Sequence, residues 1–298
     1  MPELPEVEVV RSGLEPAVAG ASVTRVEVLD ERSLRRHVGP AEDFIERLTG
    51  AVLTTPERRG KFLWIPLAEP TGREGSEAVL VHLGMSGQVL LREHAVPRNR
   101  LTRVVLEIEH PEHGPLRVDF VDQRIFGSMA LDQLVATHDH PAQLVPSQVA
   151  HIARDPLDPL FDDRAFLRAL AAKQTTIKRA LLDQTLISGI GNIYADESLW
   201  AARVHYDQPT ATLSRARATT LLAEVRLVLA RALAEGGTSF DAQYVNVNGA
   251  SGYFSHSLNA YGQQGEPCPR CGRPIVRESF MNRGSHFCAF CQRIRASR

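Results

Sequence analysis

Along the first half of the chain, the spacing of the hydrophobic positions changes from helical to strand-like. Near the N-terminus, apolar residues recur at steps of three or four, at Val7, Val10, Leu14 and Val18. Pro5 suits a first helical turn and Gly20 suits a helix end, so the pattern predicts a helix over residues 5–19. From residue 22 to residue 130, short β-prone runs alternate with glycine, proline and acidic turns. Runs at this spacing predict an antiparallel sandwich or barrel.

The second half of the chain has a helical pattern. Residues 136–160 contain four prolines and little periodicity, which indicates a linker between domains. Residues 162–235 show helical spacing and end at two glycines. Residues 238–261 are polar and contain glycine, which predicts a long ordered loop; a loop of this length inside a compact domain is usually either functional or disordered.

We therefore expect an α+β protein. An N-terminal antiparallel β-sandwich with an N-terminal helix occupies residues 2–135, and the linker occupies residues 136–160. A helical domain with the long loop follows over residues 161–261, and a cysteine-containing module over residues 262–298. The length of 298 residues suits two domains with buried cores.

The distribution of charge along the chain is more informative about partners than the net charge of the whole chain. The formal net charge is −1, which taken alone argues against a nucleic-acid partner. Residues 1–160 carry a net charge of −7, however, and residues 161–298 carry +6. A basic C-terminal half can meet a polyanion, although such tails are also simply solvated. No apolar run approaches the roughly 18 residues of a membrane span, and the N-terminus lacks a signal-peptide pattern, so we expect a cytoplasmic protein.

All four cysteines lie in one array with two CxxC pairs 16 residues apart: Cys268, Cys271, Cys288 and Cys291. This spacing is typical of a tetrahedral four-thiolate zinc site, and the β-prone residues between the pairs favour a zinc ribbon. Four thiolates leave no open coordination position, so the expected zinc is structural. The alternative is two disulfides, which would need an oxidising compartment. Arg283 lies in the expected hairpin, where a guanidinium suits contact with a phosphate.

The N-terminal residues offer a nucleophile. Removal of Met1 before a small residue exposes the secondary amine of Pro2, and an α-amino group, with a pKa of about 8, is partly neutral at pH 7. A neutral amine can attack an electrophilic carbon and form an iminium. Glu3 and Glu6 lie beside it and suit proton transfer. Taken alone, proline at position 2 is common, and acids also favour a helix N-terminus through its dipole.

Six motifs occur in a fixed order: MPELPEVEVV at the start, RRGK at 58–61, HLGMSG at 82–87, DQRIFG at 122–127, SGIGNIYADE at 188–197, and the four-cysteine array. In this combination the chain resembles the formamidopyrimidine-DNA glycosylase and endonuclease VIII family over nearly its whole length. PELPE favours the formamidopyrimidine branch, since endonuclease VIII typically begins with PEGPE. The resemblance implies a β-sandwich joined to a helix–two-turn–helix domain with a zinc finger.

For catalysis, the resemblance implies that Pro2 attacks C1′ of a flipped, oxidised purine nucleotide and displaces the base. Glu3 is then the acid that assists opening of the sugar ring, and Glu6 is a supporting carboxylate. Lys61 falls on the family's catalytic-site lysine. The chain contains only three lysines, at positions 61, 173 and 178, so a lysine kept here suggests a need for its amine. The resulting Schiff base promotes β- and then δ-elimination of both phosphates.

For DNA binding, Met85, Arg124 and Phe126 match the triad that fills the space left by the extruded base. Core packing is the ordinary alternative for Met85 and Phe126. Further residues match family positions near the DNA backbone, and Tyr194 is the weakest of them: Lys178, Asn192 and Tyr194. The glycines of SGIGN suit a close approach of backbone N–H groups to phosphate, although the same residues also suit a plain junction between helices.

Two parts of the family pattern differ here. Tyr244, Val245 and Asn246 lie in the long loop, where family backbone amides read the purine edge, but this loop lacks the lysine found in some members. A family DNA-contact histidine has no clear counterpart before residue 102, where Arg100 or Arg103 is the candidate replacement.

The lead hypothesis is a bifunctional DNA glycosylase and AP lyase acting on oxidised purines in damaged double-stranded DNA. An endonuclease VIII-like preference for oxidised pyrimidines and a non-catalytic zinc-ribbon protein that binds damaged DNA are the alternatives. We expect one zinc ion, no organic cofactor, no membrane partner and a monomer.

Overall fold

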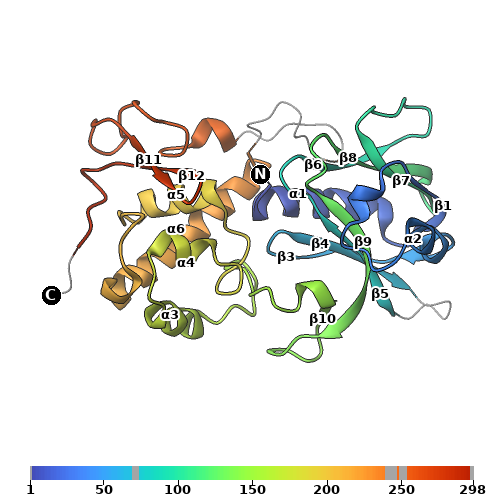
Figure 1. Ribbon diagram of the computed structural model, residues 1–298, viewed down its shortest axis with the longest axis horizontal. Coiled ribbons are helices and arrows are strands. Elements are labelled where there is room, and N and C mark those ends of the chain that lie inside the picture. Colours follow the sequence, from blue (N-terminus) through green and yellow to red (C-terminus); the bar gives the residue numbers. More distant parts are fainter. Residues whose placement is uncertain (1, 69–73, 239–246, 248–253, 296–298) are drawn as a thin grey trace. The chain divides into compact units, whose positions relative to one another are not determined.

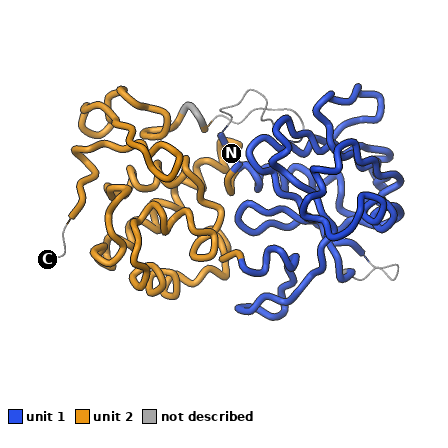
Figure 2. The backbone as a smooth tube through the Cα atoms, viewed as in Figure 1, with its two compact units in different colours: residues 1–2, 6–151, 238–252 blue, residues 3–5, 152–237, 253–298 orange. Residues whose placement is uncertain are grey.

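The computed structural model describes residues 2–68, 74–238, 247 and 254–295. The chain divides into two compact units, which Figure 2 shows in different colours. Unit 1 comprises residues 1–2, 6–151 and 238–252, and unit 2 comprises residues 3–5, 152–237 and 253–298. The chain therefore passes into unit 2 within the segment that was expected to be a linker. No described helix has the length and apolarity needed to cross a membrane.

Unit 1 contains an antiparallel sheet together with most of the N-terminal helix α1 (Leu4–Val18) and the short helix α2 (Ala41–Leu48). The strands are β1 (Ser22–Val28), β2 (Val52–Leu53), β3 (Glu57–Arg59), β4 (Phe62–Ala68), β5 (Glu74–His82), β6 (Gly87–Arg92), β7 (Thr102–His110), β8 (Gly114–Asp122), β9 (Ser128–Ala136) and β10 (Leu144–Pro146). Two 3₁₀ turns, η1 (Glu31–Leu34) and η2 (Ser147–Val149), complete the unit.

Nine of the ten strands form one hydrogen-bonded path in the order β10-β9-β5-β4-β2-β1-β7-β8-β6, and the tenth, β3, pairs with β4 off this path. Inward-facing residues from both ends of this path belong to one buried cluster, including Ile65 on β4, Val79 on β5, Val104 on β7 and Phe120 on β8. The path is therefore bent into two layers around a common core, as a sandwich requires. The fold class predicted for this half is confirmed.

Helix α1 adds one apolar face to that core. Val7, Val10, Leu14 and Val18 are all buried and belong to the same cluster. These are the four positions whose spacing predicted the helix. In contrast, α2, β9 and β10 were not predicted as elements, and β10 lies within the expected linker, where it pairs with β9.

Unit 2 is built from helices. They are α3 (Asp163–Ala172), α4 (Ile177–Leu182), α5 (Asn192–Ala201) and α6 (Arg215–Ala234), with 3₁₀ turns η3 (Thr210–Thr212) and η4 (Phe254–Ser257). Residues 183–191 join α4 to α5 and form the turns of the expected helix–two-turn–helix element. A second buried cluster, separate from that of unit 1, includes Leu170, Leu181, Tyr194 and Leu229. The predicted helical half is confirmed.

The C-terminal module of unit 2 is a hairpin of β11 (Val276–Phe280) and β12 (Arg283–Phe287). Met281 and Asn282 form its turn, and both have positive φ, as a two-residue turn matched to strand twist requires. β12 lies beside α5 (Figure 1). The two cysteine pairs lie before β11 and after β12.

Candidate functional site

The carboxylate of Glu3 caps the N-terminus of α5. It accepts backbone N–H groups from Gly191, Ile193 and Tyr194, the last two at 3.0 and 3.4 Å. Glu3 itself is buried. A carboxylate at a helix N-terminus is stabilised by unpaired N–H groups and by the helix dipole. The residue expected to be an acid is thus oriented by α5, and Pro2 directly precedes it and is also buried.

Gly191 leaves the space that this carboxylate needs. A Cβ at residue 191 would lie 2.3 Å from Cδ of Glu3. Gly189 has φ +86°, and a Cβ there would lie 2.6 Å from Leu4. The amide of Leu4 donates to the carbonyl of Gly189 at 3.0 Å. The glycines of the SGIGN motif therefore admit residues 3 and 4 of the same chain.

Glu6 has a different partner. Its Oε1 accepts the backbone N–H and the hydroxyl of Thr238 at 2.8 and 2.9 Å. Val247 accepts the amide of Leu91 at 3.0 Å, and its side chain packs against Gly13 of α1. Thr238 and Val247 bracket the loop residues Tyr244, Val245 and Asn246, which lie outside the described residues. Thr238 and Val247, the described residues nearest to these three in the chain, therefore both have their contacts within unit 1.

Lys61 occupies the tip of the β3–β4 hairpin. Arg59 pairs with Phe62, so Gly60 and Lys61 form a two-residue turn in which Gly60 has φ +58°. Lys61 is half-buried. It belongs to a group of cations near His82, together with Arg36 and Arg35. The lysine that the family resemblance singled out thus lies close enough to His82 to affect its ionisation, together with two arginines.

His82 is neutral at physiological pH. Burial, followed by repulsion from Arg36, Lys61 and Arg35, lowers the pKa of His82 to about 4. Its Nδ1 accepts the amide of Gly84 at 3.1 Å, which only the ring without a proton on Nδ1 can do. This bond closes the turn that carries Met85.

A pH experiment tests that interpretation. Because the unfolded histidine titrates near pH 6.5, the unfolded chain binds more protons than the folded one between about pH 4 and 6.5. We expect stability to fall as the pH is lowered through this window, and His82→Asn, which retains a short acceptor for Gly84, to remove that part of the fall. Thermal melts of both proteins between pH 7 and 4.5 measure it. Parallel curves would contradict the prediction.

The expected triad lies on two turns of unit 1. Met85 follows β5, whereas Arg124 and Phe126 follow β8. Met85 and Phe126 are 47% and 48% exposed, and Arg124 is exposed as well, so none of them is a core residue. The Arg124 guanidinium lies 5.7 Å from the centre of the Phe126 ring. The core-packing alternative is thus excluded for Met85 and Phe126.

Asp122 joins the two turns. It is fully buried, and its Oδ1 accepts the hydroxyl of Ser86 at 2.5 Å and the amide of Arg124 at 3.0 Å. Its Oδ2 accepts the amide of Gly127 at 2.7 Å. One carboxylate thus holds the backbone of Arg124 and the residues that directly follow Met85 and Phe126.

The second turn has further support from Arg35. Its guanidinium donates to the carbonyls of Ile125, at 2.8 Å, and Phe126. Ile125 has φ +56°, which is unfavourable for a β-branched residue. Gly84 also has positive φ, and a Cβ there would lie 2.3 Å from the backbone of Phe126. The two turns therefore touch at Gly84. The exposed side chains of Met85, Arg124 and Phe126 extend from backbone that is held by several hydrogen bonds.

We expect Asp122→Asn to lower lesion cleavage roughly a hundredfold, since a misplacement of about 1 Å has that effect. The amide would direct an NH₂ group at a donor that now faces an oxygen. Asp132 accepts Ser147, Gln148 and Gln133 in a similar way, so Asp132→Asn is the matched control. Single-turnover cleavage of a lesion duplex measures the effect. Equal loss in both variants would remove the special role of Asp122.

Three further candidates lie in unit 2. Lys178 on α4 is 0% exposed, and its ammonium contacts Asp196 at 2.6 Å, Ser285 Oγ at 2.6 Å and the carbonyl of Gly284 at 3.3 Å. Burial lowers the pKa of Lys178, and the charge of Asp196 opposes this. Asn192 donates to the same Gly284 carbonyl at 3.0 Å. Both side chains thus hold β12, while Tyr194 is buried against Phe254.

The remaining cationic candidates differ in accessibility. Arg283 is exposed at the start of β12, next to the carbonyl that Lys178 and Asn192 hold. Arg103 donates to the carbonyl of Asp122 at 2.8 Å. Arg100 is exposed and has no side-chain partner among the described residues. The guanidinium of Arg100 is therefore accessible to a ligand, whereas that of Arg103 is held by Asp122.

The four cysteine thiols form the expected metal centre. Their Sγ atoms all lie within 4.8 Å of one another, and the cysteines form no disulfide. The indole N–H of Trp200 donates to Cys268 Sγ at 3.4 Å, and Gln292 accepts the amide of Cys288 at 2.9 Å. Four clustered thiolates supported by N–H donors fit a tetrahedral zinc ion. The disulfide alternative is excluded.

Removal of zinc is expected to weaken DNA binding strongly. The cluster fixes the hairpin whose Gly284 carbonyl meets Lys178 and Asn192. Without the metal, the candidate phosphate contacts at this hairpin, Arg283 and Asn192, are displaced, and losing two DNA contacts of about 1.4 kcal/mol each weakens affinity roughly a hundredfold. Fluorescence anisotropy of a lesion duplex before and after chelation measures this, and added zinc restores binding. Unchanged affinity in chelated protein would refute the role of the finger.

Sequence reasoning missed the partners that hold these residues. Asp122, Arg35, Ser86 and Asp196 were not candidates, although Asp122 and Ser86 belong to the DQRIFG and HLGMSG motifs, and Asp196 to SGIGNIYADE. An aspartate next to a predicted turn is a sequence signal for such a supporting residue. The sequence does not show, however, which donors its carboxylate contacts.

Comparisons with known proteins agree with this architecture. Three family models match: the formamidopyrimidine-DNA glycosylase N-terminal domain over residues 1–129, the formamidopyrimidine-DNA glycosylase H2TH domain over 152–243, and the zinc finger found in FPG and IleRS over 265–294. Together they define a glycosylase-type chain with a C-terminal zinc finger.

Curated relatives identify the family. The formamidopyrimidine-DNA glycosylase of Leifsonia xyli subsp. xyli is 66% identical over 301 residues, covering 99% of this chain and 100% of the relative. That of Streptomyces coelicolor is 57% identical over 293 residues, covering 98% of each. The chain belongs to the formamidopyrimidine-DNA glycosylase family.

Solved structures agree. The Lactococcus lactis Fpg in complex with abasic-site-containing DNA has a TM-score of 0.81 and 28% identity, with coverage of 98% of this chain and 99% of that one. The same protein with DNA containing N7-benzyl-Fapy-dG has a TM-score of 0.82 and 29% identity, with the same coverage.

Proposed function

We propose that this protein is a bifunctional DNA glycosylase and AP lyase that excises oxidised purines, 8-oxoguanine and formamidopyrimidines, from duplex DNA in base excision repair. Family membership and the titles of the Lactococcus lactis complexes, which name abasic-site and Fapy-dG DNA, support this substrate class. The single observation that carries the proposal is Glu3, held by the α5 N-terminus directly after the amine-bearing Pro2.

The proposed reaction starts with base flipping, because the glycosidic carbon is unreachable inside the stack. The lone pair of the Pro2 nitrogen forms a bond to C1′ and the bond from C1′ to the base breaks. The base leaves with the electron pair of that bond and takes a proton from solvent. The Glu3 carboxylate takes the proton that the Pro2 nitrogen loses and passes it to the ring oxygen O4′ as the bond from C1′ to O4′ breaks, which leaves an iminium. This cation acidifies the neighbouring C–H bond, so β-elimination and then δ-elimination release the two phosphates. Lys61 holds the phosphate beside the lesion, and Glu6 supports the site through Thr238.

DNA binding is assigned to residues of both units. Met85, Phe126 and Arg124 fill the space left by the base, with the guanidinium bonded to the estranged cytosine. Asn192 and Arg283 contact the backbone near the lesion. Lys178 and Tyr194 are buried, so we assign them a supporting role for Gly284 and α5 and not a direct phosphate contact.

Loop and domain assignments complete the proposal. The amides of Tyr244, Val245 and Asn246 read the purine edge.

We assign residues 2–135 to the catalytic domain and residues 136–160 to a linker, although residues 3–5 group with unit 2. Residues 161–261 form the DNA-binding helical domain, and residues 262–298 form the zinc finger. Every motif lies on one chain, so we propose a monomer that acts on chromosomal DNA in the bacterial cytoplasm. Light scattering tests the oligomeric state.

One experiment tests the activity. The protein is incubated with duplexes containing 8-oxoguanine or thymine glycol, each with sodium borohydride, which reduces an iminium to a stable amine. We expect a trapped adduct and cleaved strands on 8-oxoguanine opposite cytosine. Cleavage only of thymine glycol would favour the endonuclease VIII-like alternative. Binding without cleavage of either duplex would favour a non-catalytic DNA-binding protein.

A further inference from the structure

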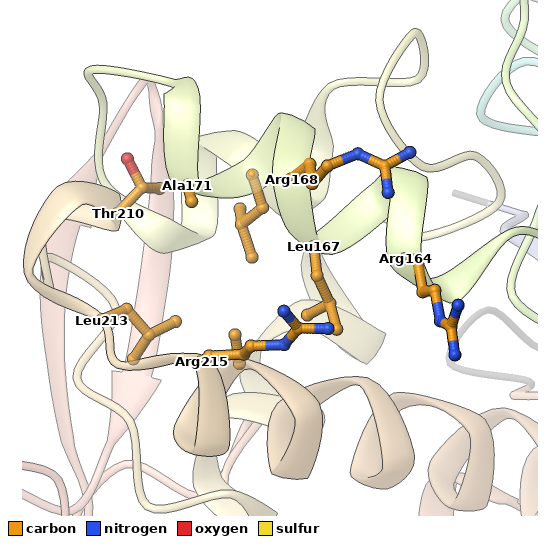
Figure 3. Close-up of a pocket in the computed structure, with 9 residues that line it drawn as sticks. Arg164, Leu167, Arg168, Ala171, Thr210, Leu213 and Arg215 are labelled. Atoms are coloured by element: carbon orange, nitrogen blue, oxygen red, sulfur yellow. The ribbon is translucent and has the colours of Figure 1, made fainter.

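A cavity of about 430 Å³ opens in unit 2 between α3 and the start of α6. We call it the α3–α6 pocket, and Figure 3 shows its lining: Arg164, Leu167, Arg168, Leu170, Ala171, Thr210, Leu213, Arg215 and Ala218. None of the candidate DNA-binding or catalytic residues is among them. The pocket is therefore a feature that the proposed function does not use.

The floor of the pocket is apolar. Leu170, Leu213 and Ala218 belong to the buried cluster of unit 2, and Leu167 packs against it. Ala171 is exposed and leaves space that a larger side chain would fill. Pockets of roughly 300–1,000 Å³ with mostly apolar walls are typical binding sites, and one leucine or phenylalanine side chain fits well within this volume.

The rim of the pocket is cationic. Arg164 and Arg168 are four residues apart, on one face of α3, and Arg215 is the first residue of α6. All three are exposed, and none has an ion-pair or hydrogen-bond partner for its guanidinium among the described residues. The nearby Asp163 is already paired with Arg226. In Figure 3 the three guanidinium groups lie toward one side and Leu213, Thr210 and Ala171 toward the other.

These features define the chemistry of a ligand. An apolar group must enter the floor while several negative charges meet three guanidiniums. A lipid-like acid with one carboxylate would leave two of them unpaired. A nucleic acid has the charges, but no aromatic ring lines the pocket on which a base could stack. A peptide with an apolar side chain and several neighbouring carboxylates matches both the apolar floor and the cationic rim.

We propose that the α3–α6 pocket docks an acidic peptide segment of a partner protein. One leucine, isoleucine or phenylalanine enters the cavity, and flanking aspartates or glutamates pair with Arg164, Arg168 and Arg215. The segment binds independently of lesion cleavage, so the proposed catalytic function can fail without affecting this inference.

The test uses the zinc-loaded full chain with ¹³C-labelled leucine methyl groups. The probe is a capped octapeptide, Asp-Glu-Asp-Leu-Phe-Asp-Glu-Asp, added to millimolar concentration. We expect methyl shifts at Leu167, Leu170 and Leu213. A peptide with Asn and Gln in place of the acids, and one with Ser-Ser in place of Leu-Phe, are expected to give none.

Two variants separate charge from shape. Arg168→Gln is expected to weaken the peptide roughly tenfold, as for one lost charge-assisted contact. Its matched control is Arg231→Gln, an exposed α6 arginine that does not line the pocket. Ala171→Leu fills the cavity without changing charge and is expected to abolish the shifts. Because Ala171 is exposed, this change leaves the buried core intact.

Four results would overturn the inference: no shifts with the acidic peptide, shifts that persist in Ala171→Leu, equal weakening by Arg168→Gln and Arg231→Gln, or displacement of the peptide by an undamaged duplex. The last result would assign the three arginines to DNA.

Discussion

A chain whose Pro2 nitrogen is locked in a peptide bond is expected to give no borohydride-trapped adduct. Insertion of one leucine between Met1 and Pro2 keeps the methionine in place, because aminopeptidases remove it only before small residues. The amide nitrogen then has no available lone pair for attack on C1′. Removal of a nucleophile lowers cleavage roughly a thousandfold or more. Gel analysis of trapped and cleaved 8-oxoguanine duplex measures both steps.

Two companion proteins make this result interpretable. Pro2→Gly retains an N-terminal amine but loses the ring, so it is expected to trap weakly and cleave slowly. The unmodified chain, with its N-terminal mass checked by mass spectrometry, sets the reference. All three proteins are expected to bind an abasic-analogue duplex with similar affinity. An unchanged adduct in the inserted chain would identify another nucleophile, and Lys61 would be the first residue to examine.

Gly191→Ala is the second large effect that we expect. The backbone at residue 191 has φ −124°, which alanine adopts without strain, so the change acts only through its Cβ. That atom would lie 2.3 Å from Cδ of Glu3 and displace the carboxylate from the α5 amides. We expect kcat to fall roughly a hundredfold or more, because both position and proton transfer are lost. Single-turnover kinetics measures the fall.

A double variant tests whether Gly191 acts through Glu3. Glu3→Asp shortens the side chain and makes room for the new Cβ, so the double variant is expected to lose much less than the product of the two single losses. Gly50→Ala is the control: it has positive φ but open space, so strain appears in stability and not in cleavage. Multiplicative losses would show that Gly191 does not act through Glu3.

Local patterns were sufficient for much of the fold. The apolar stripe of Val7, Val10 and Leu14 predicted α1, and short β-prone runs between turn residues predicted strands such as β1 and β7. Spacing alone predicted the cysteine cluster, because a CxxC pair places both thiols in one turn. The helix α2 was missed although Ala41, Phe44 and Leu48 face the core at helical spacing. Eight residues among strands gave too short a pattern to stand out.

The candidate site was predictable in residue type but not in its supports. Glu3 and Ile193 are 190 residues apart, so no local pattern joins them. Asp122 and Ser86 are 36 residues apart and meet only because β6 and β8 pair. The burial of Lys178 was equally hidden, since a lysine in a helix is usually solvated. Partners of this kind depend on tertiary packing, which the sequence does not report.

The contacts of α1 set a limit on how this family member can vary in length. Glu6 contacts Thr238 and Gly13 contacts Val247, so one helix holds two residues that flank Tyr244, Val245 and Asn246 in the chain. Each inserted or deleted residue rotates the rest of a helix by about 100°. One such change between Glu6 and Gly13 would turn one anchor away from its partner while the other stayed in place. Substitutions of exposed residues between the anchors, such as Ser12, keep this register, whereas insertions and deletions do not.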